Sequence, residues 1–155
     1  MLRPEKLKVL PGKAESADPS GYVVDEQAGF LLRVAIQRHT AIFTSRMIEA
    51  LTPTQFGALA KLLEVGPCSQ NHLGRLIYLD AATIKGVVDR LTARGFVATT
   101  NDTIDRRRLA VTLTDSGRAV IEAAIKVAVE ITAATLAPLS PEEQLAIVKL
   151  LKKLG

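Results

Sequence analysis

Apolar side chains recur at helical spacing over the first half of the chain. Between Asp25 and Leu51 the positions with this period are Ala28, Leu31, Leu32, Ala35, Ile36, Ile42, Phe43 and Met47. The pattern predicts one long helix. A second helix begins at Thr52, because a capping hydroxyl is followed by Pro53 and, three residues after the cap, by Gln55. We expect it to end at Gly66-Pro67.

Two shorter helices are predicted in close succession after Pro67. Ser69 is suited to cap a helix over residues 70–78, and Asp80 to cap one over residues 81–94. Gly95 then takes the position at which helices commonly end. The two helices therefore meet at a tight turn.

Beyond Gly95 the periodicity changes from that of helices to that of strands. Residues 96–100 and 109–113 are β-prone runs, and they flank the polar segment NDTIDRRR at 101–108. These features predict a two-stranded hairpin. Helix, tight turn, helix and charged hairpin is the order of a winged helix-turn-helix, whose second helix enters the DNA major groove.

The C-terminal third is predicted to hold two more helices. Thr114 caps a long helix that stops near Pro138, and a capping box at residues 140–143 opens a last helix that reaches Leu154. Charges follow one face of the long helix at every fourth residue, namely Arg118, Glu122, Lys126 and Glu130. This stripe argues against a membrane span. The rest of the helix is apolar nearly all round, which favours a subunit interface.

The predicted elements divide the chain into three regions. Residues 1–21 hold three prolines, two glycines and few large apolar side chains, so we expect a flexible arm. Residues 22–51 and 114–155 form a helical dimerisation region, and residues 52–113 form the winged helix-turn-helix. The predicted fold class is mostly α, a winged helix-turn-helix with a helical dimerisation region.

Composition permits a nucleic-acid partner without requiring one. The 155 residues are 48% hydrophobic, and 20 Lys and Arg exceed 16 Asp and Glu to give a net charge of +4. Whether nucleic acid is a partner therefore depends on where the excess positive charge lies on the surface. The single Cys68 excludes an intramolecular disulfide and a Cys-rich zinc site, and the two scattered histidines predict no metal site and no cofactor. The charged, proline-broken start has no signal-peptide pattern, so we expect a cytoplasmic protein.

The helix over residues 81–94 has two chemically different faces. Ile84, Val87, Val88 and Leu91 form an apolar face for packing on the protein. The outward positions are Ala82, Thr83, Lys85, Gly86, Asp89 and Arg90. Lys85 and Arg90 have the length to reach phosphates or guanine edges. Gly86 destabilises a helix by roughly 1 kcal/mol relative to alanine. Either a close approach of DNA or tight internal packing would explain it.

Three adjacent arginines lie between the two predicted strands. Arg106, Arg107 and Arg108 are placed to send at least one guanidinium into the minor groove, and Asp105 is placed to hold Arg107. A solvated turn is the alternative for an isolated run of this kind. The preceding pair of helices favours the DNA reading.

These residues resemble the MarR family of bacterial transcription regulators over about residues 25–154. The most specific part is IDRRRLAVTLTDSGR at 104–118, in which an Asp-x-Arg wing leads through a strand to L-T-x-x-G. The resemblance implies an obligate homodimer that binds pseudo-palindromic operators. It also places Asp105 and Arg107 at the wing positions and residues 81–90 in the recognition helix. Many family members are repressors that small anionic aromatic compounds release from DNA.

An effector site is predicted on the first helix. Arg38 and His39 are candidate donors for a carboxylate or phenol, and Ile36, Ile42 and Phe43 are candidates for an apolar wall. For His39 the alternative is a core histidine, and for Arg38 a solvated or interface charge. Cys68 has no resolving partner in the chain, so we interpret it as structural.

Three classes of function compete. A ligand-responsive DNA-binding repressor is the leading hypothesis. A dimeric interaction module that uses the same fold without reading DNA would have no need for three arginines at a hairpin tip. An enzyme is disfavoured, because the chain has no Gly-rich phosphate loop, nucleophile elbow or metal-spaced set of His and carboxylate residues.

Overall fold

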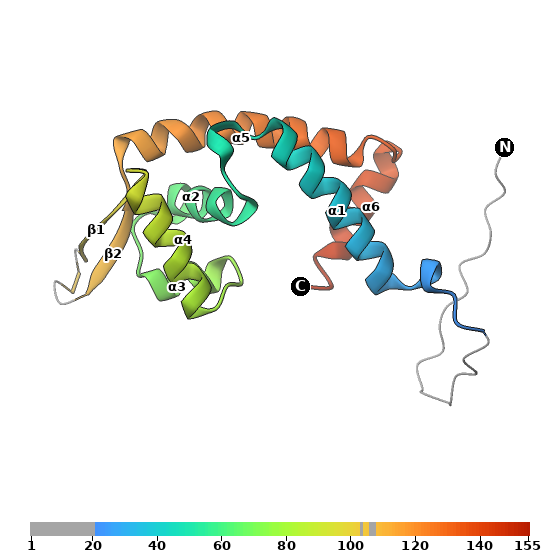
Figure 1. Ribbon diagram of the computed structural model, residues 1–155, viewed down its shortest axis with the longest axis horizontal. Coiled ribbons are helices and arrows are strands. Elements are labelled where there is room, and N and C mark those ends of the chain that lie inside the picture. The colour runs from blue at the N-terminus through green and yellow to red at the C-terminus, as the bar shows by residue number, and fades with distance from the viewer. Residues whose placement is uncertain (1–20, 103, 106–107) are drawn as a thin grey trace. The chain divides into compact units, whose positions relative to one another are not determined.

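The computed structural model describes residues 21–102, 104–105 and 108–155 (Figure 1). Two compact units divide the chain, residues 1–35 and 36–155. The elements in chain order are the 3₁₀ turn η2 (Val24–Glu26), α1 (Ala28–Arg46), the 3₁₀ turn η3 (Ile48–Ala50), α2 (Pro53–Val65), α3 (Gln70–Leu76), α4 (Ala81–Ala93), β1 (Val97–Asn101), β2 (Leu109–Leu113), α5 (Asp115–Leu136) and α6 (Pro141–Leu151). The described residues are mostly helical, with one antiparallel pair of strands. This confirms the predicted fold class.

Five helices begin at the residues that the capping signals predict. In each, the side-chain oxygen of the cap accepts a hydrogen bond from the backbone N–H three residues later; the caps are Thr52, Ser69, Asp80, Thr114 and Ser140. The capping box of α2 is complete, since Thr52 N–H also donates to Gln55 Oε1 over 3.1 Å. These contacts satisfy N–H groups that have no partner within the helix.

The predicted long helix over residues 25–51 is wrong at both ends. Gln27 is extended and separates η2 from α1, while Met47 is extended and ends α1 at Arg46. The chain then turns through Glu49 (φ 54°) and Ala50 (φ 46°), a backbone conformation that is unfavourable for residues other than glycine. The apolar pattern extends to Leu51 because the side chains of Met47 and Leu51 are both buried. Both enter the core from a turn rather than from a helix.

Three smaller boundaries also differ from the prediction. Helix α3 ends at Leu76 rather than at residue 78, because Leu79 N–H returns to Gly74 O (2.9 Å) and Tyr78 adopts a positive φ of 58°. The first strand is shifted by one residue to Val97–Asn101, and α6 stops at Leu151 instead of Leu154. Gly95 has a φ of +74° directly after α4, as its predicted role requires.

A single hydrophobic core lies within residues 36–155. The buried face of α4 is the predicted one, and Ile84, Val87, Val88 and Leu91 are all at most 4% exposed. They belong to one buried cluster that also holds Leu59 and Leu62 of α2, Leu73 of α3, Phe96 and Val111 of the hairpin region, and Ile121, Ala124 and Ile131 of α5. Burial of this face fixes which side of α4 remains outward.

The hairpin is extended by one residue of the segment before α3. Cys68 and Val111 exchange both backbone hydrogen bonds, at 3.2 and 2.8 Å, so Cys68 pairs with β2 on the side away from β1. Partial burial raises the pKa of the Cys68 thiol above its usual value, which keeps the thiol protonated at neutral pH. Both observations agree with a structural interpretation of this cysteine.

The start of α5 packs against the backbone that joins α4 to the hairpin. Thr114 Oγ1 donates to Gly95 O over 2.6 Å, and Thr114 N–H donates to Phe96 O over 3.1 Å. Gly117 lies so close to this backbone that a Cβ atom would sit 1.8 Å from Phe96 O. Only glycine fits at position 117.

Helices α5 and α6 leave several large apolar side chains exposed. Val129 of α5 is 66% exposed, and Leu145 of α6 is 76% exposed. No helix among residues 21–102, 104–105 and 108–155 is long and apolar enough to cross a membrane.

We predict that Gly117→Ala destabilises the protein. The added methyl group must displace the Phe96 backbone, and overpacking of this kind costs about 1–3 kcal/mol. Urea denaturation measures the loss, and Ser116→Ala at the exposed neighbouring position is the control. Equal stability of the two variants would show that Phe96 moves without cost.

Candidate nucleic-acid interface

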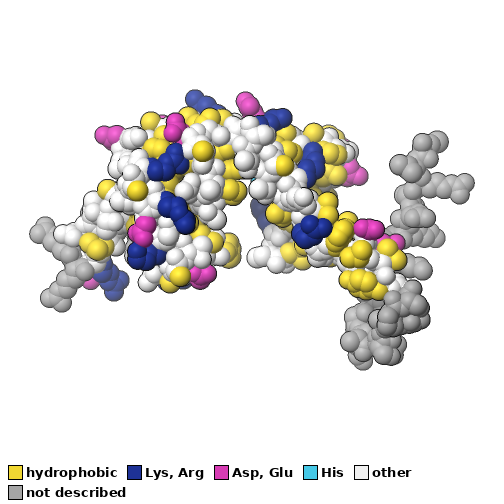
Figure 2. Space-filling view, viewed as in Figure 1, with side chains coloured by type: hydrophobic (Ala, Val, Ile, Leu, Met, Phe, Trp, Pro, Cys, Tyr) yellow, Lys and Arg dark blue, Asp and Glu magenta, His cyan; other side chains and the backbone are white. Residues whose placement is uncertain are grey.

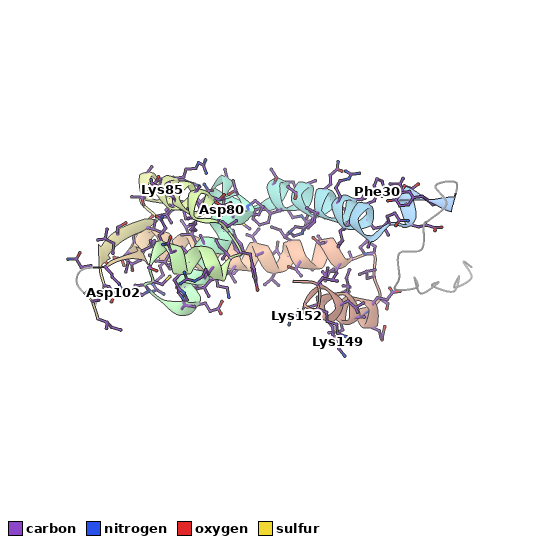
Figure 3. All side chains as sticks on the ribbon, turned by 90° about the horizontal axis from the view of Figure 1, so that it is seen from below. Phe30, Asp80, Lys85, Asp102, Lys149 and Lys152 are labelled. Carbon is purple, nitrogen blue, oxygen red and sulfur yellow. The ribbon has the colours of Figure 1, made fainter. Side chains whose placement is uncertain are left out.

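The predicted DNA-reading residues of α4 lie together on one accessible face. Ala82, Thr83, Lys85, Asp89 and Arg90 are exposed, and Gly86 is half-buried among them. Figure 2 shows Lys and Arg side chains gathered over α4, with acidic side chains beside them. In Figure 3, Asp80 and Lys85 lie along the edge that α4 forms, and Asp102 lies on the hairpin.

Asp80 fixes the N-terminal end of α4. Its Oδ1 accepts from Thr83 N–H at 2.7 Å, and its Oδ2 accepts from the Thr83 hydroxyl at 3.0 Å. These hydrogen bonds, the backbone one first, hold the pKa of Asp80 below its usual value. The Thr83 hydroxyl therefore already donates its hydrogen, so while it stays on Asp80 it can only accept a hydrogen bond, from an N–H or amino group and not from a phosphate.

Lys85 is paired within α4. Its Nζ lies 2.6 Å from Asp89 Oδ2, and the two side chains are 64% and 60% exposed. An exposed pair of this kind contributes little to stability, so Lys85 exchanges partners readily. Asp89 thus holds Lys85 on the outward face, and any anion that approaches Lys85 must compete with this carboxylate.

Arg94 is a residue that the sequence reasoning missed. Its Nη2 donates to Glu49 O over 2.5 Å and lies 3.6 Å from Glu49 Oε2, while its guanidinium carbon stands 4.6 Å from the centre of the Phe96 ring. Arg94 therefore ties the C-terminal end of α4 to the strained turn between α1 and α2. No sequence signal links residues 45 positions apart.

The base of the hairpin tip is organised by carboxylates. Asp102 Oδ1 accepts from the N–H groups of Ile104 (2.7 Å) and Asp105 (3.2 Å), and these bonds, with a smaller contribution from Arg108, lower the pKa of Asp102. Asp105 Oδ2 lies 3.4 Å from Arg108 Nε. Arg106 and Arg107 are outside the described residues, as is the predicted contact between Asp105 and Arg107.

A groove of about 630 Å³ separates α3 from the hairpin. Its lining includes Gln70, Asn71 and Arg75 from α3 and Thr99, Arg108 and Leu109 from the hairpin. Arg75 thus lines the same groove as Arg108, a neighbour that its position in the sequence did not reveal. His72 is exposed, and its Nδ1 lies 3.5 Å from Arg75 Nη2.

The predicted effector donors meet the C-terminal end of α5. Arg38 donates to Thr135 O (2.6 Å) and Ala134 O (3.1 Å), two of the carbonyls that a helix end leaves without partners. His39 Nδ1 lies 2.9 Å from Thr135 Oγ1, whose hydrogen is donated to Ile131 O. His39 Nδ1 is therefore the donor to Thr135. A neutral imidazole carries only one N–H, so this histidine has no further N–H to offer an effector.

The three residues of the predicted apolar wall differ in burial. Phe43 is buried in the core and Ile42 packs against that core, whereas Ile36 is 62% exposed. The His39 and Phe43 ring centres are 6.2 Å apart, so the histidine lies beside the buried end of the predicted wall.

Comparisons with known proteins identify the family. The MarR family model matches residues 51–109. The HTH-type transcriptional repressor NicR of Pseudomonas putida is 43% identical over 148 residues, which is 95% of this chain and 93% of NicR. The chain belongs to the MarR family of transcription regulators. The match to the family model begins one residue before the predicted winged helix-turn-helix at 52–113 and covers most of it.

Two solved structures of bacterial DNA-binding or transcription-regulating proteins are similar to most of the chain. A probable transcriptional regulator from Pseudomonas aeruginosa is 50% identical, with a TM-score of 0.83 over 86% of this chain and 100% of the other. BpsR of Bordetella bronchiseptica, whose DNA binding is regulated by 6-hydroxynicotinic acid, is 43% identical, with a TM-score of 0.81 over 86% of this chain and 96% of BpsR. The sequence resemblance to the MarR family is thereby confirmed.

We predict that the charge of Asp80 stabilises the protein above pH 3.8, the usual pKa of the group. Because folding lowers this pKa, the contribution is complete above the unfolded value and is lost as the pH falls through the folded one. Thermal melting of the wild type and of Asp80→Asn checks this. The wild type should have the higher Tm at neutral pH, and the advantage should disappear in acid. An advantage that grows as the pH falls would contradict the cap assignment.

Proposed function

We propose that this MarR-family chain is a homodimeric repressor that binds a pseudo-palindromic operator and is released by a small aromatic or heteroaromatic acid. The observation that carries the DNA half is the division of α4 into a fully buried aliphatic face and an accessible face with Lys85 and Arg90. The 43% identity to NicR, a transcriptional repressor, supports repression rather than activation.

In this proposal α4 enters the major groove and the wing reaches the adjacent minor groove. Lys85 and Arg90 contact phosphates or base edges, and Arg108, with its neighbours Arg106 and Arg107, supplies the wing cations. The alternative, a dimeric interaction module that does not read DNA, is disfavoured, because such a module has no need for exposed cations on both α4 and the hairpin tip.

The homodimer is supported by the apolar surface of the last two helices. Val129, Leu145 and Leu154 are 66–76% exposed, and Val148, Leu150 and Leu151 add to the surface. A second copy would cover this surface and bring two α4 helices into symmetric positions. Two such helices fit half-sites about one DNA turn apart, roughly 34 Å or a multiple of it.

The effector half is supported by the relatives and by the position of Arg38. BpsR is regulated by 6-hydroxynicotinic acid and is 43% identical to this chain, so the same acid is the first candidate. Its carboxylate would replace the carbonyls of Thr135 and Ala134 at Arg38, a stronger interaction for a guanidinium. An acid that binds better to dimers with wrongly spaced α4 helices would shift the population away from DNA.

We predict salt-dependent binding of duplex DNA that Arg90→Ala weakens. Each cation that contacts a phosphate releases counterions, so the slope of log affinity against log salt should fall by about one in this variant. Fluorescence anisotropy with a duplex that the wild type enriches from a random-sequence library measures both quantities.

Lys126→Ala, at an exposed position of α5 away from α4, is the matched control and should bind as the wild type does. Sedimentation of the same samples should give two chains per duplex. A wild type that enriches no duplex would refute the DNA half, and a folded monomer at micromolar concentration would refute the dimer.

We predict that 6-hydroxynicotinic acid raises the Tm of the wild type and weakens its DNA binding. Arg38→Ala should raise the acid concentration required by about tenfold or more, because a hydrogen bond to a charged group contributes about 1.5–3 kcal/mol. Thermal shift and DNA anisotropy in a titration of the acid provide the two readouts.

Thr40→Ala, two residues further along α1 and exposed, is the control and should respond as the wild type does. If neither melting nor DNA affinity changes with the acid in any variant, this effector is wrong while DNA binding stands. If Arg38→Ala responds to the acid as the wild type does, Arg38 does not bind the effector and serves only to hold the C-terminal end of α5.

A further inference from the structure

Gly86 has no explanation within the described part of the chain. It lies in the middle of α4, where glycine is less favourable than alanine because it loses more conformational freedom on folding. Two internal reasons commonly retain a helical glycine, namely a positive φ and a close packing contact. Gly86 has neither, since its φ is not in the positive range and a Cβ atom there would meet only Arg90 Nη1 at 3.7 Å and Nη2 at 4.0 Å.

Gly117 is a glycine that packing within the chain does require, and it differs clearly from Gly86. A Cβ at Gly117 would lie 1.8 Å from a backbone oxygen, whereas the Arg90 nitrogens near Gly86 are at ordinary van der Waals distance and end a flexible side chain. Of the two explanations that the sequence left open for Gly86, tight internal packing is therefore excluded for the residues described.

The position of Gly86 points to the partner. Ala82 lies one turn before it and Arg90 one turn after it on the same outward face of α4. The buried face lies opposite, so any requirement for the absent side chain comes from a molecule that approaches α4 from outside. This is the face that the proposed function directs into the major groove.

We propose that Gly86 is the point of closest approach between α4 and duplex DNA, so that the helix backbone itself contacts the DNA. The inference rests on the proposed DNA-binding function and adds a steric determinant to it. A methyl group at this position would hold the helix away by about the length of one carbon–carbon bond, roughly 1.5 Å. The contacts of Lys85 and Arg90 would then lengthen together.

Arg90 has a defined part in this arrangement. Its guanidinium lies over Gly86, and within the described residues it forms no hydrogen bond or ion pair. On binding, Arg90 turns from the helix surface to a phosphate and uncovers the Gly86 backbone for contact with the DNA.

The test is Gly86→Ala compared with Gly57→Ala. Gly57 lies in the middle of α2, and a Cβ atom there would meet nothing within 4 Å. Both substitutions place alanine at an open helical position, so both should raise the Tm by a few degrees, about 3 °C. Only Gly86→Ala should weaken binding of the duplex enriched by the wild type, by about tenfold.

A second comparison, Arg90→Ala with and without Gly86→Ala, distinguishes close approach of the DNA to Gly86 from a role of Gly86 in positioning the Arg90 side chain. The affinity loss caused by Gly86→Ala is measured again in the Arg90→Ala background. Close approach predicts that the loss persists there. Disappearance of the loss would mean that glycine serves only to seat Arg90, and the inference would be overturned.

Two other outcomes also overturn it. If Gly86→Ala binds the enriched duplex as tightly as the wild type, α4 does not need the glycine, although the proposed DNA binding stands. If Gly86→Ala lowers the Tm while Gly57→Ala raises it, an internal contact requires the glycine. Failure of the wild type to enrich any duplex refutes the proposed function itself, and the inference with it.

Discussion

The contact between the start of α5 and the backbone at Phe96 holds α4 and the hairpin in place. Gly95 ends α4 there, Phe96 leads into β1, and Thr114 and Gly117 of the α5 start close on the same peptide groups. Recognition helix, wing and long helix thus meet at one point at backbone distance. A shift of the α5 start would therefore act directly on the backbone that joins α4 to the hairpin, because no flexible side chain lies between them.

Local chemistry accounts for the features that the sequence predicted well. The caps Thr52, Asp80 and Thr114 act on N–H groups three residues away, and the buried face of α4 follows from a period of 3.6 residues. The turn at Glu49 and the positive φ of Tyr78 left no such trace, because both occur at residues other than glycine. Arg94 was missed because its partner Glu49 lies in another element.

Within the candidate interface, the sequence indicated which residues face outward but not what they contact. The Lys85–Asp89 pair and the Asp80–Thr83 cap could be inferred from spacing alone, whereas the position of Arg75 beside Arg108 depends on how α3 packs against the hairpin. The carboxylates among the cations have a common effect. They pair with exposed cations and lower the local excess of positive charge, which reduces nonspecific attraction to polyanions.

The backbone pair between Cys68 and Val111 has a consequence for the sheet itself. A two-stranded ribbon offers an open row of peptide groups along each outer edge, onto which a strand of another molecule could add. Cys68 occupies the edge of β2 near its middle and leads directly into α3, so an incoming strand finds the row interrupted and a helix beside it. The short bridge thereby protects the β2 edge of the hairpin from edge-to-edge self-association.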